Sequence, residues 1–123
     1  MKTLNNAIIA VTGAAQGLGR AISRALCDKG ATVVLLDINQ TALENTAQQL
    51  KQQSFQVHQY HCDIANEQHV RDVFQQIKKE VGDLDGLVNN AGVTRDGLLV
   101  KSNESEVTDG LSLSHWQQVI GIN

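Results

Sequence analysis

The 123-residue sequence contains no proline, only 3% aromatic residues and no low-complexity tract. Proline and low-complexity segments are the usual marks of linkers, so nothing in the chain indicates a domain boundary. No stretch approaches the ~20 apolar residues that a membrane-spanning helix needs. The apolar run at residues 7–11 is also shorter than the ~7–15 residues of a signal-peptide core. We therefore expect a cytoplasmic protein with no membrane partner.

A block of charge of one sign is also missing, because 10 basic and 13 acidic residues are spread along the chain and leave a net charge of −3. This balance provides no basic patch for nucleic acid. Only two cysteines are present, Cys27 and Cys62. Without a secretory signal we expect them to be buried, reduced thiols. The 41% of hydrophobic residues is enough for the core of one domain, or of part of one.

Short apolar runs alternate with segments of helical periodicity. Four segments predict strands. Residues 7–12 and 32–37 are apolar runs typical of buried strands, residues 55–62 alternate as a third strand, and residues 85–89 form a fourth. Apolar residues at helical spacing predict three helices between them, the first of which ends at Gly30. The expected inner faces are Leu18, Ala21, Ile22, Ala25 and Leu26 in the first helix, Leu43, Ala47 and Leu50 in the second, and Val70, Val73, Phe74, Ile77 and Val81 in the third. This alternation predicts an α/β fold, a Rossmann-type parallel sheet of about four strands with helices on both faces.

The segment TGAAQGLG, residues 12–19, joins the first predicted strand to the first predicted helix. Its glycines, Gly13, Gly17 and Gly19, have the spacing G-x-x-x-G-x-G. Glycine is favoured where the chain turns sharply or where another group approaches the backbone closely, and the start of the following helix attracts anions. The pattern alone also fits a tight turn that binds nothing. Its position, and the acidic residue Asp37 at the end of the second strand, favour a dinucleotide.

These features resemble the short-chain dehydrogenases/reductases along the whole chain. The resemblance rests on TGAAQGLG, on NNAG at residues 89–92, on Asp37 and Asp63 at the ends of predicted strands, and on WQQVIGIN at residues 116–123. The segment NNAGVTRDGLL is similar to the 3-oxoacyl-carrier-protein reductase branch. The resemblance implies an oxidoreductase that moves hydride between NAD(H) and a carbonyl or alcohol substrate, with a 3-oxoacyl thioester as the leading candidate. It also implies a homo-oligomer when the protein is intact.

The resemblance assigns roles to individual residues. The implied cofactor-binding residues are Gly13, Gln16, Gly17, Leu18 and Gly19 at the pyrophosphate, Asp37 and Ile38 at the ribose, Asp63 and Ile64 at the adenine, and the flanking Asn90, Ala91 and Gly92. Asn123 matches the family's catalytic asparagine, whose backbone holds a water of the proton relay. Asn66 is the expected cap of the third helix, which leaves Asp63 free for the adenine. No metal site is expected, because His58 and His61 lie on opposite faces of a strand.

The chain departs from the family pattern in two places. The family's catalytic serine and its Tyr-x-x-x-Lys motif are absent, since the only tyrosine, Tyr60, is followed four residues later by Ile64. We therefore expect residues 1–123 to be the N-terminal NAD-binding part of a single Rossmann domain, inactive alone. A nucleotide-sensing module without catalysis is the alternative. The segment between Gly92 and Trp116 is longer than in close relatives, and fits either a surface insertion or part of the substrate entrance.

The residues around Asp37 predict NAD(H) and not NADP(H). Asp37 follows Gly17 by 20 residues, near the ~20-residue offset at which an acidic side chain meets the ribose hydroxyls. Its carboxylate would repel a 2′-phosphate. The positions where NADP(H)-binding relatives usually place a cation hold Gln16, Ile38 and Asn39. Most members of the 3-oxoacyl reductase branch use NADPH, so the residues and the branch disagree, and we base the prediction on the residues.

Overall fold

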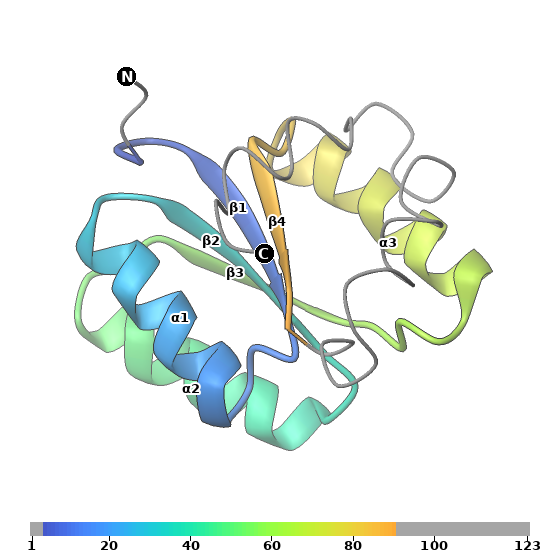
Figure 1. The fold of residues 1–123 in the computed structure, drawn as a ribbon, viewed down its shortest axis with the longest axis horizontal. Helices are drawn as coiled ribbons and strands as arrows, with labels where there is room; N and C mark the ends of the chain where they lie inside the picture. Colours follow the sequence, from blue (N-terminus) through green and yellow to red (C-terminus); the bar gives the residue numbers. More distant parts are fainter. Residues whose placement is uncertain (1–3, 91–123) are drawn as a thin grey trace.

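The computed structural model describes residues 4–90. Strands and helices alternate along this part of the chain, in the order seen in Figure 1: β1 (Ile8–Thr12), α1 (Gly17–Asp28), β2 (Thr32–Asp37), α2 (Gln40–Gln52), β3 (Val57–His61), α3 (Glu67–Glu80) and β4 (Gly86–Asn89). Each predicted strand and helix is present. Strand β2 has the predicted bounds, and β1, β3 and β4 are one to three residues shorter than the segments that predicted them.

The strands form one sheet in the order β3-β2-β1-β4, and every neighbouring pair is parallel. Thr12 at the end of β1 pairs with Leu36 on one side and with Asn89 on the other, and Asp37 pairs with His61. The carboxyl ends of all four strands therefore lie along one edge of the sheet. The chain runs outward from β1 to β3 and then returns to the other side of β1. Such a reversal of strand order opens a ligand crevice at the carboxyl edge of an α/β sheet.

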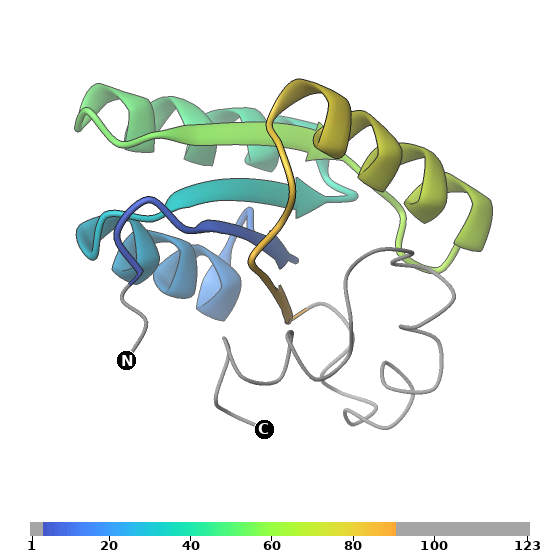
Figure 2. The same ribbon diagram turned by 90° about the horizontal axis from the view of Figure 1, so that it is seen from above.

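Helices cover both faces of the sheet, as predicted. Helices α1 and α2 lie on one side and α3 lies on the other (Figures 1 and 2). Alternate strand residues point to the two sides, so the sheet carries two cores. Residues facing α1 and α2 are Ile9, Val11, Val33, Leu35, Val57 and Val88, and residues facing α3 are Ala10, Val34, Leu36 and Leu87. Burial on both faces explains the continuous apolar runs of β1 and β2. The edge strand β3 is only partly buried, and its sequence alternates between apolar and polar residues.

The predicted inner face of α1 is wrong in part. Leu18 is 63% exposed, and Ala21 and Ala25 are also exposed, whereas the buried residues are Gly19, Ser23 and Cys27. Gly19 packs directly on the Gly13 carbonyl of the glycine turn, and this contact sets the rotation of the helix, so that the face formed by residues 19, 23 and 27 is buried. The Ser23 hydroxyl is satisfied within the helix, since it donates to the Gly19 carbonyl at 2.8 Å. The remaining predicted residues, Ile22 and Leu26, are partly buried against the core.

The inner faces of the other two helices agree with the prediction. Leu43, Ala47 and Leu50 are buried in α2, together with Thr46, and Val70, Val73 and Ile77 are buried in α3. Helix α1 ends at Asp28, and Gly30 supplies the predicted stop two residues later, with φ +90°. There the Gly30 amide donates to the Cys27 carbonyl and the Ala31 amide to the Leu26 carbonyl, the pair of bonds that closes a helix through a left-handed glycine.

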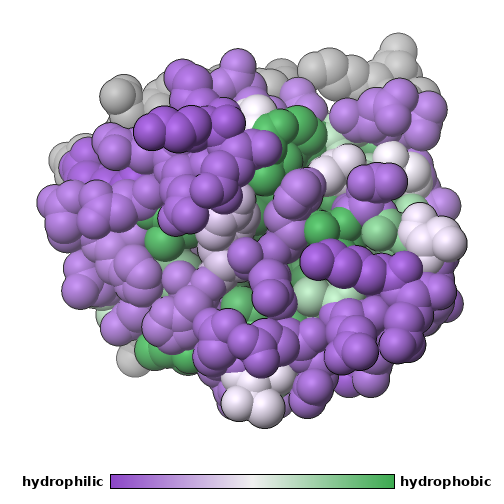
Figure 3. All heavy atoms as spheres, turned by 180° about the vertical axis from the view of Figure 1, so that it is seen from behind, coloured by the Kyte–Doolittle hydropathy of each residue, from purple (hydrophilic) through white to green (hydrophobic). Residues whose placement is uncertain are grey.

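The outer surface is mainly polar. The face opposite to that of Figure 1 is covered mostly by hydrophilic side chains, with hydrophobic atoms in small separate patches (Figure 3). Within residues 4–90 no helix is both long and apolar enough to cross a membrane. Both cysteines are free and buried, as predicted. Burial raises the pKa of each thiol to about 11, so neither is a nucleophile at neutral pH.

Candidate cofactor site at the carboxyl edge of the sheet

The glycine turn connects β1 to α1 at the carboxyl edge of the sheet. Gly13 and Gly17 have positive φ angles, +62° and +61°, a backbone conformation that glycine adopts without strain. A Cβ built on Gly17 would meet no atom within 4 Å. Gly17 is therefore required for its conformation, and none of residues 4–90 fills the space beside its backbone.

Gly19 serves a different purpose. A Cβ at this position would lie 1.9 Å from the Gly13 carbonyl oxygen and 2.8 Å from Nδ2 of Asn90. The same Asn90 amide donates to the Gly13 carbonyl oxygen at 3.2 Å. The third glycine of the motif thus lets α1 pack on the turn itself. Asn90, predicted to flank the cofactor, braces this turn from the end of β4.

Backbone and side-chain groups that are distant in the sequence also hold the glycine turn. The Ala14 amide donates to the Leu36 carbonyl at 3.1 Å, and the Ala15 amide donates to Oδ2 of Asp37 at 3.0 Å. The buried Thr46 hydroxyl of α2 donates to the Ala15 carbonyl at 2.7 Å. Thr46 is not among the site residues predicted from the sequence. Its only signal is a polar side chain on the otherwise apolar inner face of α2.

The N-terminus of α1 has no side-chain cap. Gln16 occupies the cap position in an extended conformation and its side chain accepts no bond from the helix. In contrast, the side chains of Asn39 and Asn66 cap α2 and α3, the latter as predicted. The amides of the first turn of a helix need acceptors from outside the helix. Within the described part of the chain no side chain caps the first turn of α1, and the positive end of the helix dipole there favours an anion.

Asp37 ends β2 beside this helix terminus. Its Oδ2 accepts from the Ala15 amide and its Oδ1 accepts from the Asn39 amide at 2.8 Å. A carboxylate offers about four acceptor sites, so two remain for hydroxyl groups of a ligand. The next residue, Ile38, exposes 60% of its surface. The two bonds fix the carboxylate in place, and an apolar side chain lies next to it.

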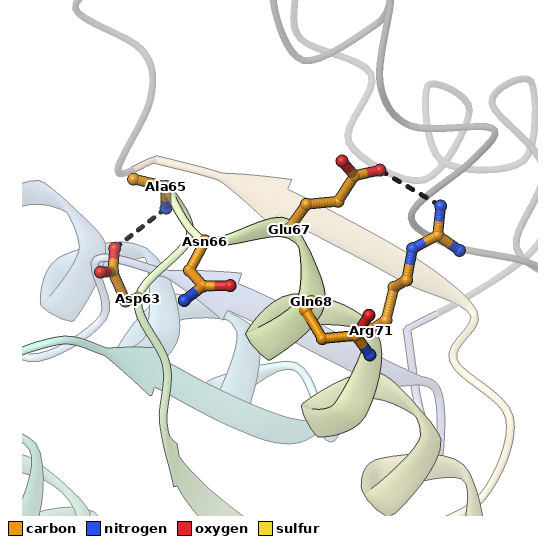
Figure 4. A pocket seen from close by; sticks show the side chains of 6 residues that line it. All are labelled: Asp63, Ala65, Asn66, Glu67, Gln68 and Arg71. Atoms are coloured by element: carbon orange, nitrogen blue, oxygen red, sulfur yellow. Dashed lines mark hydrogen bonds and ion pairs between the residues drawn. The ribbon is translucent and has the colours of Figure 1, made fainter.

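A second loop follows β3 on the same edge. Asp63 there accepts from the Ala65 amide at 3.0 Å and does not cap α3. The loop and the start of α3 line a pocket of about 720 Å³ (Figure 4). An ion pair of 3.2 Å between Glu67 and Arg71 forms one wall. Ile64, expected at the adenine, packs partly buried against the α3 core.

The remaining sequence candidates either play other parts or are not described. Tyr60 donates to Glu80 at 2.6 Å, and burial together with this bond raises the pKa of Tyr60 to about 12. Within residues 4–90 no cluster of three or more His, Cys, Asp or Glu side chains is arranged to hold a metal ion. Ala91, Gly92, Asn123 and the segment between Gly92 and Trp116 lie outside the described residues.

A parallel sheet with helices on both faces, a glycine turn at the end of β1 and an acidic residue at the end of β2 define a Rossmann-type protein. Comparison with known protein families gives a narrower assignment than the fold does. The sequence model of the short chain dehydrogenase family matches residues 7–123, and the chain belongs to this family.

Individual relatives agree with this assignment. The chain is 31% identical to the 3-oxoacyl-acyl-carrier-protein reductase of Thermotoga maritima over 120 residues, which are 98% of the chain and 45% of the relative. A short chain dehydrogenase/reductase of Burkholderia phymatum in complex with NAD matches with a TM-score of 0.68 and 25% identity, over 71% of this chain and 31% of that one. A variant of actinorhodin polyketide ketoreductase with NADPH matches with a TM-score of 0.67 and 27% identity, over 73% and 34%. The chain thus spans less than half the length of these proteins.

Proposed function

We propose that the protein containing this chain transfers hydride between NAD(H) and the carbonyl or alcohol carbon of a small molecule. Membership of the short chain dehydrogenase family supports an oxidoreductase. The observation that carries the choice of cofactor is the Asp37 carboxylate, which two backbone amides hold beside the uncapped start of α1.

The described residues fit a dinucleotide. The uncapped first turn of α1 would bind the pyrophosphate, and the space beside Gly17 leaves room for it. The two unused acceptor sites of Asp37 would take the adenosine ribose hydroxyls, and the loop that carries Asp63 would meet the adenine. The nicotinamide, when bound, supplies or accepts the hydride. Asn123 is the proposed catalytic asparagine and Asn90 is proposed to position the turn, with Ala91 and Gly92 following it along the cofactor.

Charge supports NAD(H) over NADP(H). A 2′-phosphate at the ribose would meet the Asp37 carboxylate, and like charges brought together in a partly dry site cost several kcal/mol. No cation occupies the neighbouring positions, which hold Gln16, Ile38 and Asn39. The similar structures include one with NAD and one with NADPH, so family membership leaves both cofactors open and the residues decide the proposal.

We expect the full-length protein to bind NADH ~10²-fold more tightly than NADPH, a ratio that corresponds to about 2.7 kcal/mol. Asp37→Asn removes the negative charge and should reduce this ratio to about tenfold or less. Titration of cofactor fluorescence at fixed salt concentration measures both affinities. Asp83→Asn removes an equal charge from the exposed loop before β4 and should leave the ratio unchanged. Equal or tighter NADPH binding by the unaltered protein would show that Asp37 is not the selector.

The substrate, assembly and location follow from the resemblance. We propose a 3-oxoacyl thioester as substrate because the Thermotoga maritima relative, named as a 3-oxoacyl-acyl-carrier-protein reductase, aligns with 98% of this chain. A homo-oligomer in the cytoplasm is part of the same proposal. Comparing kcat/KM for an acetoacetyl thioester with that for small ketones tests the proposed substrate. A clear preference for a ketone would contradict the proposal of a 3-oxoacyl thioester.

A further inference from the structure

Two histidine side chains contact the loops that would enclose the adenosine. Nε2 of His61, the last residue of β3, lies 3.0 Å from the Ile38 carbonyl oxygen in the loop after β2. Nδ1 of His69, in the first turn of α3, lies 3.2 Å from the Asp63 amide in the loop after β3. The centroids of the two imidazole rings are 5.8 Å apart. The pair thus touches both loops.

The partners fix the role of each ring nitrogen. A carbonyl oxygen carries no proton, so Nε2 of His61 is the donor toward Ile38. A backbone amide can only donate, so Nδ1 of His69 is unprotonated and accepts. His69 is the third residue of α3, and in a capping box this residue's side chain returns to the amide of the cap residue. Here the Asn66 amide already donates to the Asp63 carbonyl at 3.0 Å. Nδ1 of His69 therefore accepts from the Asp63 amide, three residues before the cap, and not from the Asn66 amide.

These contacts begin where the sheet stops. The bonding between β2 and β3 continues only to the Cys62 amide, which donates to the Asp37 carbonyl at 3.0 Å. Beyond that point the two loops leave their strands, and the histidine side chains supply the next bonds to Ile38 and Asp63. Ile38 is 60% exposed, so its own side chain packs little against the rest of the fold.

We propose that His61 and His69 are positioning residues that hold these two loops at the separation needed to bind the adenosine part of a dinucleotide. The inference rests on the proposed function, because it concerns the same site. Neither histidine needs to touch the ligand. Each histidine acts through the backbone of a loop residue, Ile38 or Asp63. The side chains in these two loops are the ones expected to contact the ribose and the adenine.

The test uses the full-length protein and ADP-ribose, which carries the adenosine and both phosphates and lacks the nicotinamide. His69→Leu removes the acceptor, whereas His69→Asn retains an oxygen near the position of Nδ1. One hydrogen bond contributes modestly, so we expect His69→Leu and His61→Leu each to weaken ADP-ribose binding about 3- to 10-fold by calorimetry. His69→Asn should restore most of the affinity. His58→Leu is the matched control. His58 lies on β3 like His61, and it lines a pocket of about 650 Å³ together with His61 and His69. Within residues 4–90 it bonds to neither loop.

The outcomes separate the two proposals. If the unaltered protein does not bind ADP-ribose, the proposed function fails. If it binds and His69→Leu lowers the melting temperature without changing the dissociation constant, the histidine is structural and the inference is overturned. Equal weakening by His69→Leu and His69→Asn would also overturn it, because the acceptor would then not matter. Loss with His69→Leu and recovery with His69→Asn supports it, and His61→Leu gives an independent reading should His69→Leu not fold.

Discussion

Gly19→Ala is expected to destabilise the protein by about 3 kcal/mol or more and to abolish dinucleotide binding. The added Cβ would lie 1.9 Å from the Gly13 carbonyl oxygen and 2.7 Å from its carbon, both of which are backbone atoms. The turn cannot move aside cheaply, because Asn90 holds the Gly13 carbonyl and the Leu36 carbonyl holds the Ala14 amide. Relief requires α1 to lift from the turn, which separates the helix terminus from Asp37. Urea unfolding and an NADH titration of the same preparation measure the two losses.

Gly17→Ala is the matched control for this change. Gly17, unlike Gly19, has a left-handed backbone (φ +61°), and a Cβ there would meet no atom of residues 4–90 within 4 Å. The variant should lose only the ~1–2 kcal/mol that this conformation costs an alanine, while its methyl group enters the space proposed for the pyrophosphate. Equal unfolding free energies for the two variants would contradict the distinction between a packing glycine and a conformational one.

The isolated 123-residue chain is expected to show no dehydrogenase turnover above buffer. Hydride transfer to a carbonyl needs a proton donor, and positioned general acids contribute ~10²–10⁴-fold to such reactions. The sequence holds no Tyr-x-x-x-Lys pattern, and its only tyrosine donates to Glu80 with its pKa raised to about 12. NADH oxidation with an acetoacetyl thioester and a panel of small ketones is the measurement.

The full-length protein assayed in parallel is the positive control, and Tyr60→Phe in that protein should leave kcat unchanged. Clear turnover by the pure 123-residue chain would mean that a proton donor lies within this sequence. If the full-length protein binds NADH yet reduces no substrate of the panel, the nucleotide-sensing module becomes the better reading.

Local patterns predicted the fold well because buried parallel strands and amphipathic helices leave a signal within a few residues of sequence. The exception is the face of α1, where apolar periodicity selected Leu18, Ala21 and Ala25 while the sheet contact is made by Gly19, Ser23 and Cys27. Ala21 and Ala25 are no larger than Ser23 and Cys27, so size does not separate the two sets. The packing of Gly19 on the Gly13 carbonyl sets the rotation of the helix, and it buries the face formed by residues 19, 23 and 27. Periodicity alone cannot show how closely a helix approaches its sheet.

The sequence predicted the glycine motif and the acidic residue of the candidate site, but not the hydrogen bonds that hold them in place. The glycine spacing and Asp37 place a dinucleotide turn beside an acid, and the structure brings the two together through the Ala15 amide. The contacts of Thr46, Asn90 and His69 depend on which strands are neighbours and in which register. That information arises only when segments far apart in the chain have paired, so no short window of sequence contains it.

The brace between Asn90 and Gly13 has a consequence for biosynthesis. The two residues are 77 positions apart, so Gly13 leaves the ribosome well before the asparagine that braces its turn. Chains fold as their segments emerge, and contacts between distant residues form late because loop closure must precede them. During translation the Gly13 carbonyl therefore has no bond from Asn90 until β4 has been synthesised. A nascent chain acquires this bond only after all four strands of the sheet have been made.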